Sequence, residues 1–189
     1  MATTEPIRDK EQLRELAGYW LERGNLRNYA LIVLGASTAL RIGDLLGLTW
    51  DDVYDENCGE FRPHIVLTEQ KTGKEKTVAL NRQAAGALLL YLPHRRGKHI
   101  FANNRKNGGA ISRVQAWRII RAAAESVKIK GRVACHSLRK TFGYHAWKNG
   151  ASPAVIMDIY NHSSYEVTRR YLGISQDDRD RVYLGMALF

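Results

Sequence analysis

Cysteine is scarce in this sequence of 189 residues, which contains only two. Cys58 and Cys135 have neither the spacing of a zinc site nor the density of a disulfide-stapled secreted domain, so a reducing compartment fits better. No apolar run approaches the roughly 20 residues that a membrane-spanning helix needs, and the first residues lack the apolar segment of a signal peptide. The sequence therefore predicts a cytoplasmic protein with no membrane partner.

The signatures of metal-dependent and nucleotide-dependent phosphate chemistry are also missing. The acidic residues near the basic segments do not form the paired carboxylates that a two-metal nuclease needs. The pair Gly108-Gly109 does not make a P-loop. We therefore expect neither a metal nor a cofactor.

Positive charge, in contrast, is abundant. Lysine and arginine total 29 against 19 for aspartate and glutamate, which gives a net charge of +10 and a pI near 9.8. Such an excess favours a polyanionic partner, because lysine and arginine release condensed counterions when they bind phosphates. Charge alone fits a ribosomal or merely soluble basic protein as well.

The apolar periodicity predicts a mainly α fold with one small antiparallel β-sheet. A helix opens at Asp9 and ends near Gly24, and alternation between His64 and Leu80 around a turn predicts a β-hairpin. Further helices are expected over residues 29–37, 41–46, 81–92, 113–126 (behind a capping box of Ser112 and Gln115) and 136–148, after Ser152-Pro153, and after a capping box of Ser163 and Glu166.

The helix after Pro153 is expected to turn Val155, Ile156 and Ile159 towards the core. At the other end of this region, Val182, Tyr183, Leu184, Met186, Leu188 and Phe189 make an apolar terminus. Chain ends are usually polar unless they are tied down, so this segment is expected to dock in a groove, either of a neighbouring protomer or of the chain's own core.

The segment from His136 to Thr141 is the most informative of those that could act on a phosphate. A spacing of three on a helix places His136 and Arg139 on one face, where an imidazole and a guanidinium can reach a single phosphate. Taken alone, such a pair is more often an exposed basic helix face.

Three further signals are weak by themselves. Arg41 lies among apolar residues and is costly to bury without an anion, a role that Asp44 could fill in a structural ion pair. Lys71 lies at the predicted hairpin turn, where lysines are usually only solvated, and its position relative to Leu80 favours it over Lys74 and Lys76. His162 precedes a predicted helix, and Tyr171 lies nine residues after His162, near the end of that helix. Because the chain has nine tyrosines, this spacing alone does not single out Tyr171.

In this order and spacing, the segments together resemble the tyrosine recombinase (phage integrase) family. The family motifs are an arginine followed by an acidic residue and Leu-x-Trp, a hairpin lysine before Val-x-Leu, His-x-x-Arg before a basic and a hydroxyl residue, and Gly-His nine residues ahead of a tyrosine. They are matched by Arg41 with Asp44 and Leu48-Thr49-Trp50, by Lys71 with Val78-Ala79-Leu80, by His136 to Thr141, and by His162 with Tyr171.

The resemblance implies a site-specific DNA recombinase that cleaves and rejoins DNA through a 3′-phosphotyrosyl link to Tyr171. It also implies double-stranded DNA as the partner, a tetramer on that DNA, and a place at the nucleoid in a bacterial cytoplasm. In the implied mechanism Arg41 and Arg139 hold the non-bridging oxygens, Lys71 protonates the leaving 5′ oxygen, His136 assists deprotonation of Tyr171, and His162 hydrogen-bonds the phosphate.

Three features depart from the family pattern. Asp44 stands where the family more often has glutamate, a change that keeps the carboxylate. Asn161 replaces the usual glycine before His162. Only about forty residues precede Arg41, so residues 1–189 are expected to form a single catalytic domain without the family's separate N-terminal DNA-binding domain.

Two other functions share much of this pattern. A type IB topoisomerase-like enzyme relaxes one duplex instead of exchanging strands, and a DNA-binding regulator with the same fold does not cleave. A regulator has no need for both Lys71 and Tyr171, which argues against it. A covalent protein–DNA adduct separates enzyme from regulator, and recombination between two sites separates recombinase from topoisomerase.

Overall fold

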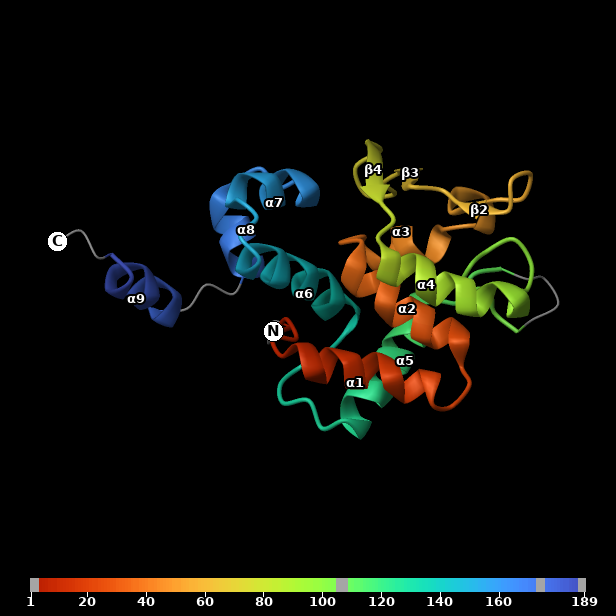
Figure 1. Ribbon diagram of the computed structural model, residues 1–189, viewed down its shortest axis with the longest axis horizontal. Coiled ribbons are helices and arrows are strands. Elements are labelled where there is room, and N and C mark those ends of the chain that lie inside the picture. Colours follow the sequence, from red (N-terminus) through yellow and green to blue (C-terminus); the bar gives the residue numbers. More distant parts are fainter. Residues whose placement is uncertain (1–3, 105–108, 173–175, 187–189) are drawn as a thin grey trace. The chain divides into compact units, whose positions relative to one another are not determined.

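The computed structural model describes residues 4–104, 109–172 and 176–186. They fall into two compact units, Met1–Phe142 and Gly143–Phe189, each described by itself (Figure 1). Helices are the main element of both units, and the strands form two small antiparallel sheets in the first. The predicted fold class, mainly α with a small antiparallel sheet, is confirmed. Among the described residues, no helix is both long and apolar enough to cross a bilayer.

Capping side chains set where the helices of the first unit begin. Asp9 accepts a hydrogen bond from the Glu11 backbone N–H at 2.7 Å, and Ser112 and Gln115 form the predicted capping box. These bonds satisfy backbone N–H groups that have no partner within a helix. The helices are α1 (Lys10–Leu21), α2 (Leu26–Ser37), α3 (Ile42–Gly47), α4 (Arg82–Tyr91), α5 (Arg113–Ser126) and α6 (Cys135–Lys148), which continues into the second unit, with 3-10 turns η1 (Trp50–Asp52) and η2 (Leu92–His94).

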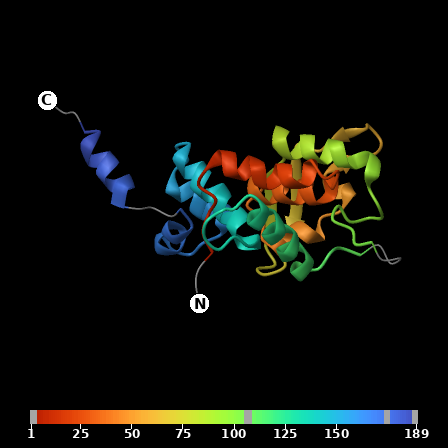
Figure 2. The ribbon, with the colours of Figure 1, turned by 90° about the horizontal axis from the view of Figure 1, so that it is seen from below.

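Helix α2 is the centre of the first unit's core. Its residues Leu31 and Leu34 lie in one apolar cluster with Leu88 of α4, and Ile32 lies in a second cluster with Leu16 of α1. Figures 1 and 2 show α2 between α1 and α4, which it contacts on opposite sides. A helix that is apolar on most of its surface is stable only when it is buried in this way. The core therefore gives the segment after α2, which carries Arg41, a rigid base.

The predicted hairpin is present as β3 (His64–Thr68) and β4 (Glu75–Ala79), paired antiparallel with Thr68 opposite Glu75. Its alternation is as expected, because Ile65 is fully buried whereas its neighbours in the strand are exposed. The prediction of one sheet was wrong, because β1 (Tyr54–Asp55) and β2 (Glu60–Phe61) form a second. Strands of two residues are too short to show an alternating pattern in the sequence.

The second unit contains the end of α6 followed by α7 (Pro153–Tyr160), α8 (Tyr165–Leu172) and α9 (Gln176–Leu184). Ser152 caps α7 and proline takes its first position, as predicted. The prediction that Val155 faces inward was wrong. The buried stripe of α7 consists of Ile156 and Tyr160, which are four residues apart, and Val155 is exposed. Helix α8 begins at Tyr165, one residue later than the start that the predicted cap at Ser163 implies.

Candidate active site

Arg41 lies at the start of α3 and points its guanidinium at the end of strand β3. Its Nη1 is 2.6 Å from Oε1 of Glu69 in an ion pair, and 24% of the Arg41 side chain is exposed. The suggested ion pair with Asp44 was wrong. Asp44 is buried and accepts a hydrogen bond from the Gln70 backbone N–H at 2.9 Å, so its carboxylate holds the hairpin turn instead.

Glu69 is a buried carboxylate that the sequence motifs do not single out. Its side chain is 2% exposed, and it also accepts a hydrogen bond from the Thr72 hydroxyl at 2.7 Å. Burial raises the pKa of Glu69, but the ion pair with Arg41, the hydrogen bond from Thr72 and the charge of Lys76 outweigh burial and lower the pKa below its ordinary value. Glu69 is therefore held as a carboxylate.

Lys76 is the second residue that the motifs miss. It lies on β4 opposite Leu67, its side chain is 13% exposed, and its Nζ is 3.8 Å from Oε1 of Glu69. Burial and then the positive charge of Arg139 lower the pKa of Lys76, while the charge of Glu69 opposes this shift. A signal for Glu69 existed, because the period of two that buries Ile65 also turns position 69 inward. The place of Lys76 depends on the register of the hairpin, which pairs it with Leu67.

Lys71, in contrast, is an exposed residue of the hairpin turn. The residue before it, Gln70, is held by Asp44 of α3, and the residue after it, Thr72, is held by Glu69. The turn is thus fastened on both sides of Lys71, next to the helix that Arg41 begins. This places the backbone of the predicted proton donor beside the predicted phosphate-binding arginine.

His136 and Arg139 both lie in α6, as predicted, but their exposure differs. His136 is exposed, whereas Arg139 is 2% exposed and donates a hydrogen bond from Nη1 to the Ala39 carbonyl. Ala39 has a left-handed backbone (φ 54°) and lies two residues before Arg41. Arg139 and Arg41 are therefore brought to the same short segment of chain.

The two residues that follow Arg139 in the motif have another task. Lys140 donates a hydrogen bond to the Thr4 carbonyl at 2.7 Å, and the Thr141 hydroxyl accepts one from the Ile7 backbone N–H at 2.8 Å. Both side chains are buried, and burial lowers the pKa of Lys140. These residues fasten the segment before α1 to α6 and so stabilise the helix that carries Arg139.

The second unit brings His162 and Tyr171 together. Their ring centroids are 4.6 Å apart in an edge-to-face arrangement, and Tyr171 is partly exposed. Nδ1 of His162 lies 3.0 Å from the hydroxyl of Thr168, which fixes the ring plane. The fully buried ring of Tyr160 stacks on His162 at 5.2 Å, and Gly143 leaves the space that Tyr160 occupies. The burial of Tyr160 removes it as an alternative nucleophile.

Asn161 ends α7 in the left-handed conformation, with φ 52° and ψ 49°. Asparagine tolerates this conformation better than other residues with a Cβ, so the departure from glycine preserves the turn before His162. We expect Asn161→Gly to be more stable than Asn161→Ala by about 1 kcal/mol, because both lose the amide but only alanine strains the backbone. Thermal unfolding should separate their midpoints by roughly 2–4 °C. Equal midpoints would contradict a strained turn.

Each unit thus holds one part of the predicted chemistry. Arg41, Lys71, His136 and Arg139 belong to the first unit, where cations surround Glu69 and can bind the oxygens of a phosphate. In the second unit, the partly exposed phenol of Tyr171 packs edge-to-face against the imidazole of His162, so the predicted nucleophile and the predicted phosphate-binding histidine lie side by side. Within residues 4–104, 109–172 and 176–186, no three His, Cys, Asp or Glu side chains are grouped as metal ligands.

Sequence comparisons give close relatives. The phage integrase family model matches residues 8–177. "Probable integrase/recombinase YoeC" of Bacillus subtilis is 33% identical over 183 residues, which is 97% of this chain and 97% of that protein. "Tyrosine recombinase XerD" of Mycobacterium tuberculosis is 34% identical over 169 residues. That match includes 85% of this chain but only 52% of the XerD sequence, so the chain spans about half the length of that relative.

Solved structures share the fold. The crystal structure of XerA recombinase matches 97% of this chain with a TM-score of 0.77 at 23% identity, covering 66% of that chain. The XerH site-specific recombinase bound to palindromic difH substrate, a post-cleavage complex, also has a TM-score of 0.77, at 17% identity, over 97% of this chain and 53% of that one. The family model covers most of the sequence, and the chain therefore belongs to the phage integrase family, the tyrosine recombinases.

Proposed function

We propose that this chain is a site-specific DNA recombinase in which Tyr171 cleaves DNA and forms a 3′-phosphotyrosyl link. The observation that carries the proposal is the partly exposed Tyr171 ring held 4.6 Å from His162 at the end of α8. Arg41 and Lys76, the two cations beside Glu69, can bind the oxygens of the phosphate that Tyr171 attacks. Membership of the tyrosine recombinase family supports both assignments.

In the proposed cleavage step, the Tyr171 oxygen attacks phosphorus as its proton leaves, with His136 assisting. The bond to the 5′ oxygen breaks, and Lys71 gives that oxygen a proton. Arg41 and Arg139 bind the non-bridging oxygens and stabilise the charge that develops on them, and His162 adds a hydrogen bond. The 5′-hydroxyl of another strand then attacks the phosphotyrosine and releases Tyr171. The ester keeps the bond energy, so the exchange needs no nucleotide.

Double-stranded DNA is the proposed partner. The net charge of +10 favours a polyanion. The related structures include XerH bound to difH substrate and a lambda integrase dimer bound to a core site. We place the protein at the nucleoid in a bacterial cytoplasm, as its relatives from Bacillus subtilis and Mycobacterium tuberculosis are bacterial. Residues 1–189 act, in this proposal, as one catalytic domain.

The experiment that tests this function uses a plasmid with two copies of a candidate site. A recombinase should delete or invert the DNA between the copies and leave a new junction that sequencing reads. A plasmid with one copy serves as the control, because a type IB topoisomerase-like enzyme relaxes it without making a junction. Relaxation of both plasmids with no junction would replace the proposed function by that alternative.

DNA binding should depend steeply on salt. If about six phosphates are neutralised, the affinity falls by roughly 10³-fold between 50 and 200 mM salt. Fluorescence anisotropy with a labelled duplex measures this as the slope of log affinity against log salt. A slope near zero would show that phosphate contacts do not dominate binding.

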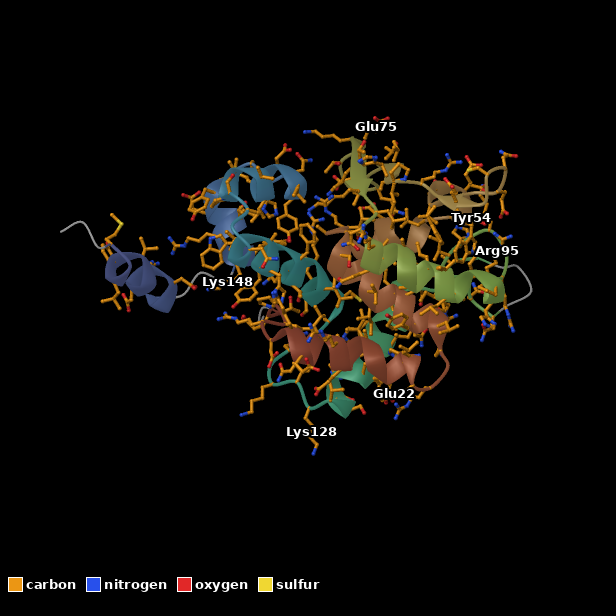
Figure 3. The ribbon with its side chains drawn as sticks, viewed as in Figure 1. Glu22, Tyr54, Glu75, Arg95, Lys128 and Lys148 are labelled. Carbon is orange, nitrogen blue, oxygen red and sulfur yellow. The ribbon has the colours of Figure 1, made fainter. Side chains whose placement is uncertain are left out.

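The apolar end of α9 supports assembly into a tetramer on DNA. Val182, Tyr183, Leu184 and Met186 are all strongly exposed, and Leu184 reaches 87%. Leu188 and Phe189 lie outside the described residues. Asp178, early in α9, forms an ion pair with Lys148 at the end of α6, a residue labelled in Figure 3. Exposed apolar side chains of this kind mark a surface that another protein covers.

Deleting residues 182–189 should therefore leave a folded chain that cleaves single sites but assembles poorly on paired sites. We expect synapsis, measured as slow-migrating complexes in gel shifts, to fall by about tenfold or more, since several buried side chains are lost. Cleavage of a half-site should change by less. Loss of folding, or unchanged synapsis, would place this segment on the chain's own core.

A further inference from the structure

We propose that Glu69 is a positioning residue for DNA cleavage, which holds Arg41 with one carboxylate oxygen and the turn of Lys71 with the other. The proposal rests on the proposed function and assigns a role to a residue outside the six predicted ones. Glu69 lies at the end of β3, in the first unit, so its contacts are all within one compact body.

The contacts of the two carboxylate oxygens differ. Oε1 lies 2.6 Å from Nη1 of Arg41 and 3.8 Å from Nζ of Lys76. The contact with Arg41 is a close ion pair and not an aligned hydrogen bond. Oε2 accepts the hydroxyl hydrogen of Thr72 at 2.7 Å. One buried carboxylate is therefore shared between α3 and the hairpin turn.

The pair orients Arg41 without covering it. Nη1 is buried against Glu69, but 24% of the Arg41 side chain stays exposed. A guanidinium has five N–H donors, so an ion pair at one nitrogen leaves the others for a phosphate. Arg41 is thus held in place before DNA arrives, which lowers the entropy that phosphate binding has to overcome.

Glu69 also closes the turn around Lys71. Its backbone N–H donates to the Lys74 carbonyl at 2.9 Å, and its carbonyl accepts from the Gly73 N–H at 2.9 Å. With the bond from Thr72, the backbone and the side chain of Glu69 both bind the turn. The position of the proton donor is therefore coupled to that of Arg41 through this one residue.

A purely structural role is the alternative, because a buried carboxylate with two cations near it can simply satisfy them. Buried ion pairs are often no better for stability than apolar residues of similar volume. A structural residue would affect the melting temperature and the amount of folded protein. A positioning residue affects the rate of the bound complex, and affects it differently according to whether the leaving oxygen needs a proton.

The test measures single-turnover cleavage of a nicked site at saturating DNA, with a normal phosphate or with a bridging 5′-sulfur, which leaves without a proton. Thr72→Val should slow cleavage of normal DNA by about tenfold, and sulfur should restore the rate, because only the turn is released. Glu69→Gln should slow it by about 100-fold, and sulfur should restore it only in part, because Arg41 is also released. Glu69→Asp should recover part of the rate.

The matched control is Glu75→Gln on the same hairpin, since Glu75 is exposed and lies at the tip in Figure 3. It should cleave both substrates at the wild-type rate. Adding Glu69→Gln to Arg41→Ala should cost nothing further on the sulfur substrate, because residues that act through one another are not additive. Thr72→Val keeps the pair of Glu69 with Arg41, so it tests the coupling even if Glu69→Gln does not fold.

The role of Glu69 would be overturned if Glu69→Gln cleaved both substrates at the wild-type rate, or if Thr72→Val lost the same factor in cleavage rate on both. In either case a covalent adduct formed by the wild-type chain would leave the proposed function standing. A wild-type chain that forms no covalent adduct would overturn the proposed function, and the role of Glu69 with it.

Discussion

Replacement of Tyr171 by phenylalanine is expected to abolish covalent attachment to DNA and to lower cleavage by more than about 10⁴-fold, as loss of a nucleophile does in other enzymes. Only the hydroxyl is lost, and the ring still packs against His162 and Tyr160, so folding and DNA affinity should change little. Single-turnover cleavage of a nicked site, read on a denaturing gel, measures the loss, and a gel shift measures the affinity.

Tyr165→Phe is the matched control, because Tyr165 is exposed on the same helix and is the other accessible tyrosine of α8. It should form the adduct at the wild-type rate. An adduct that survives in Tyr171→Phe and disappears in Tyr165→Phe would show that Tyr165 is the nucleophile.

Lys71→Ala is expected to slow cleavage of normal DNA by about 10³-fold, the effect of losing a general acid. A substrate with a bridging 5′-sulfur at the scissile phosphate should regain most of that loss, because a thiolate leaves without a proton. The measurement is the ratio of cleavage rates on the two substrates. Lys74→Ala, in the same turn, is the control and should show the same ratio as the wild type.

The structure favours Lys76 over Lys74 as the rival for this role. Burial and the charge of Arg139 lower the pKa of Lys76, and a lowered pKa suits a lysine that transfers protons near neutral pH. Lys71 is exposed, but the hairpin turn that carries it is fastened beside α3. Rescue of Lys76→Ala by sulfur, with no rescue of Lys71→Ala, would reassign the proton donor to Lys76.

The sequence was sufficient for most helix boundaries of this fold, because they depend on local chemistry. Asp9, Asn81 and Ser112 each cap the helix that they were expected to begin. Tertiary packing decides the rest. Val155 lies next to Ile156 in the sequence, but Ile156 and Tyr160 are the buried residues of α7 and Val155 is exposed. Two-residue strands such as β1 depend on pairing and not on pattern.

The candidate site shows the same division. Motif spacing singled out His162 and Tyr171 as site residues, and the structure places their ring centroids 4.6 Å apart. Spacing could not choose between Asp44 and Glu69 as the partner of Arg41, because that depends on how the hairpin lies on α3. The six predicted site residues remain predictions of function until their variants are assayed.

In the proposed mechanism, Tyr171 becomes joined to the 3′ end of cleaved DNA. Mass spectrometry locates this link when the wild-type adduct is trapped on a nicked site and digested with protease and nuclease. We expect a nucleotide attached through a 3′-phosphate to the peptide that contains Tyr171, together with a free 5′-hydroxyl on the released strand. Attachment at another residue, a 5′-phosphate link, or cleavage with no attached nucleotide would show that Tyr171 does not form the proposed link.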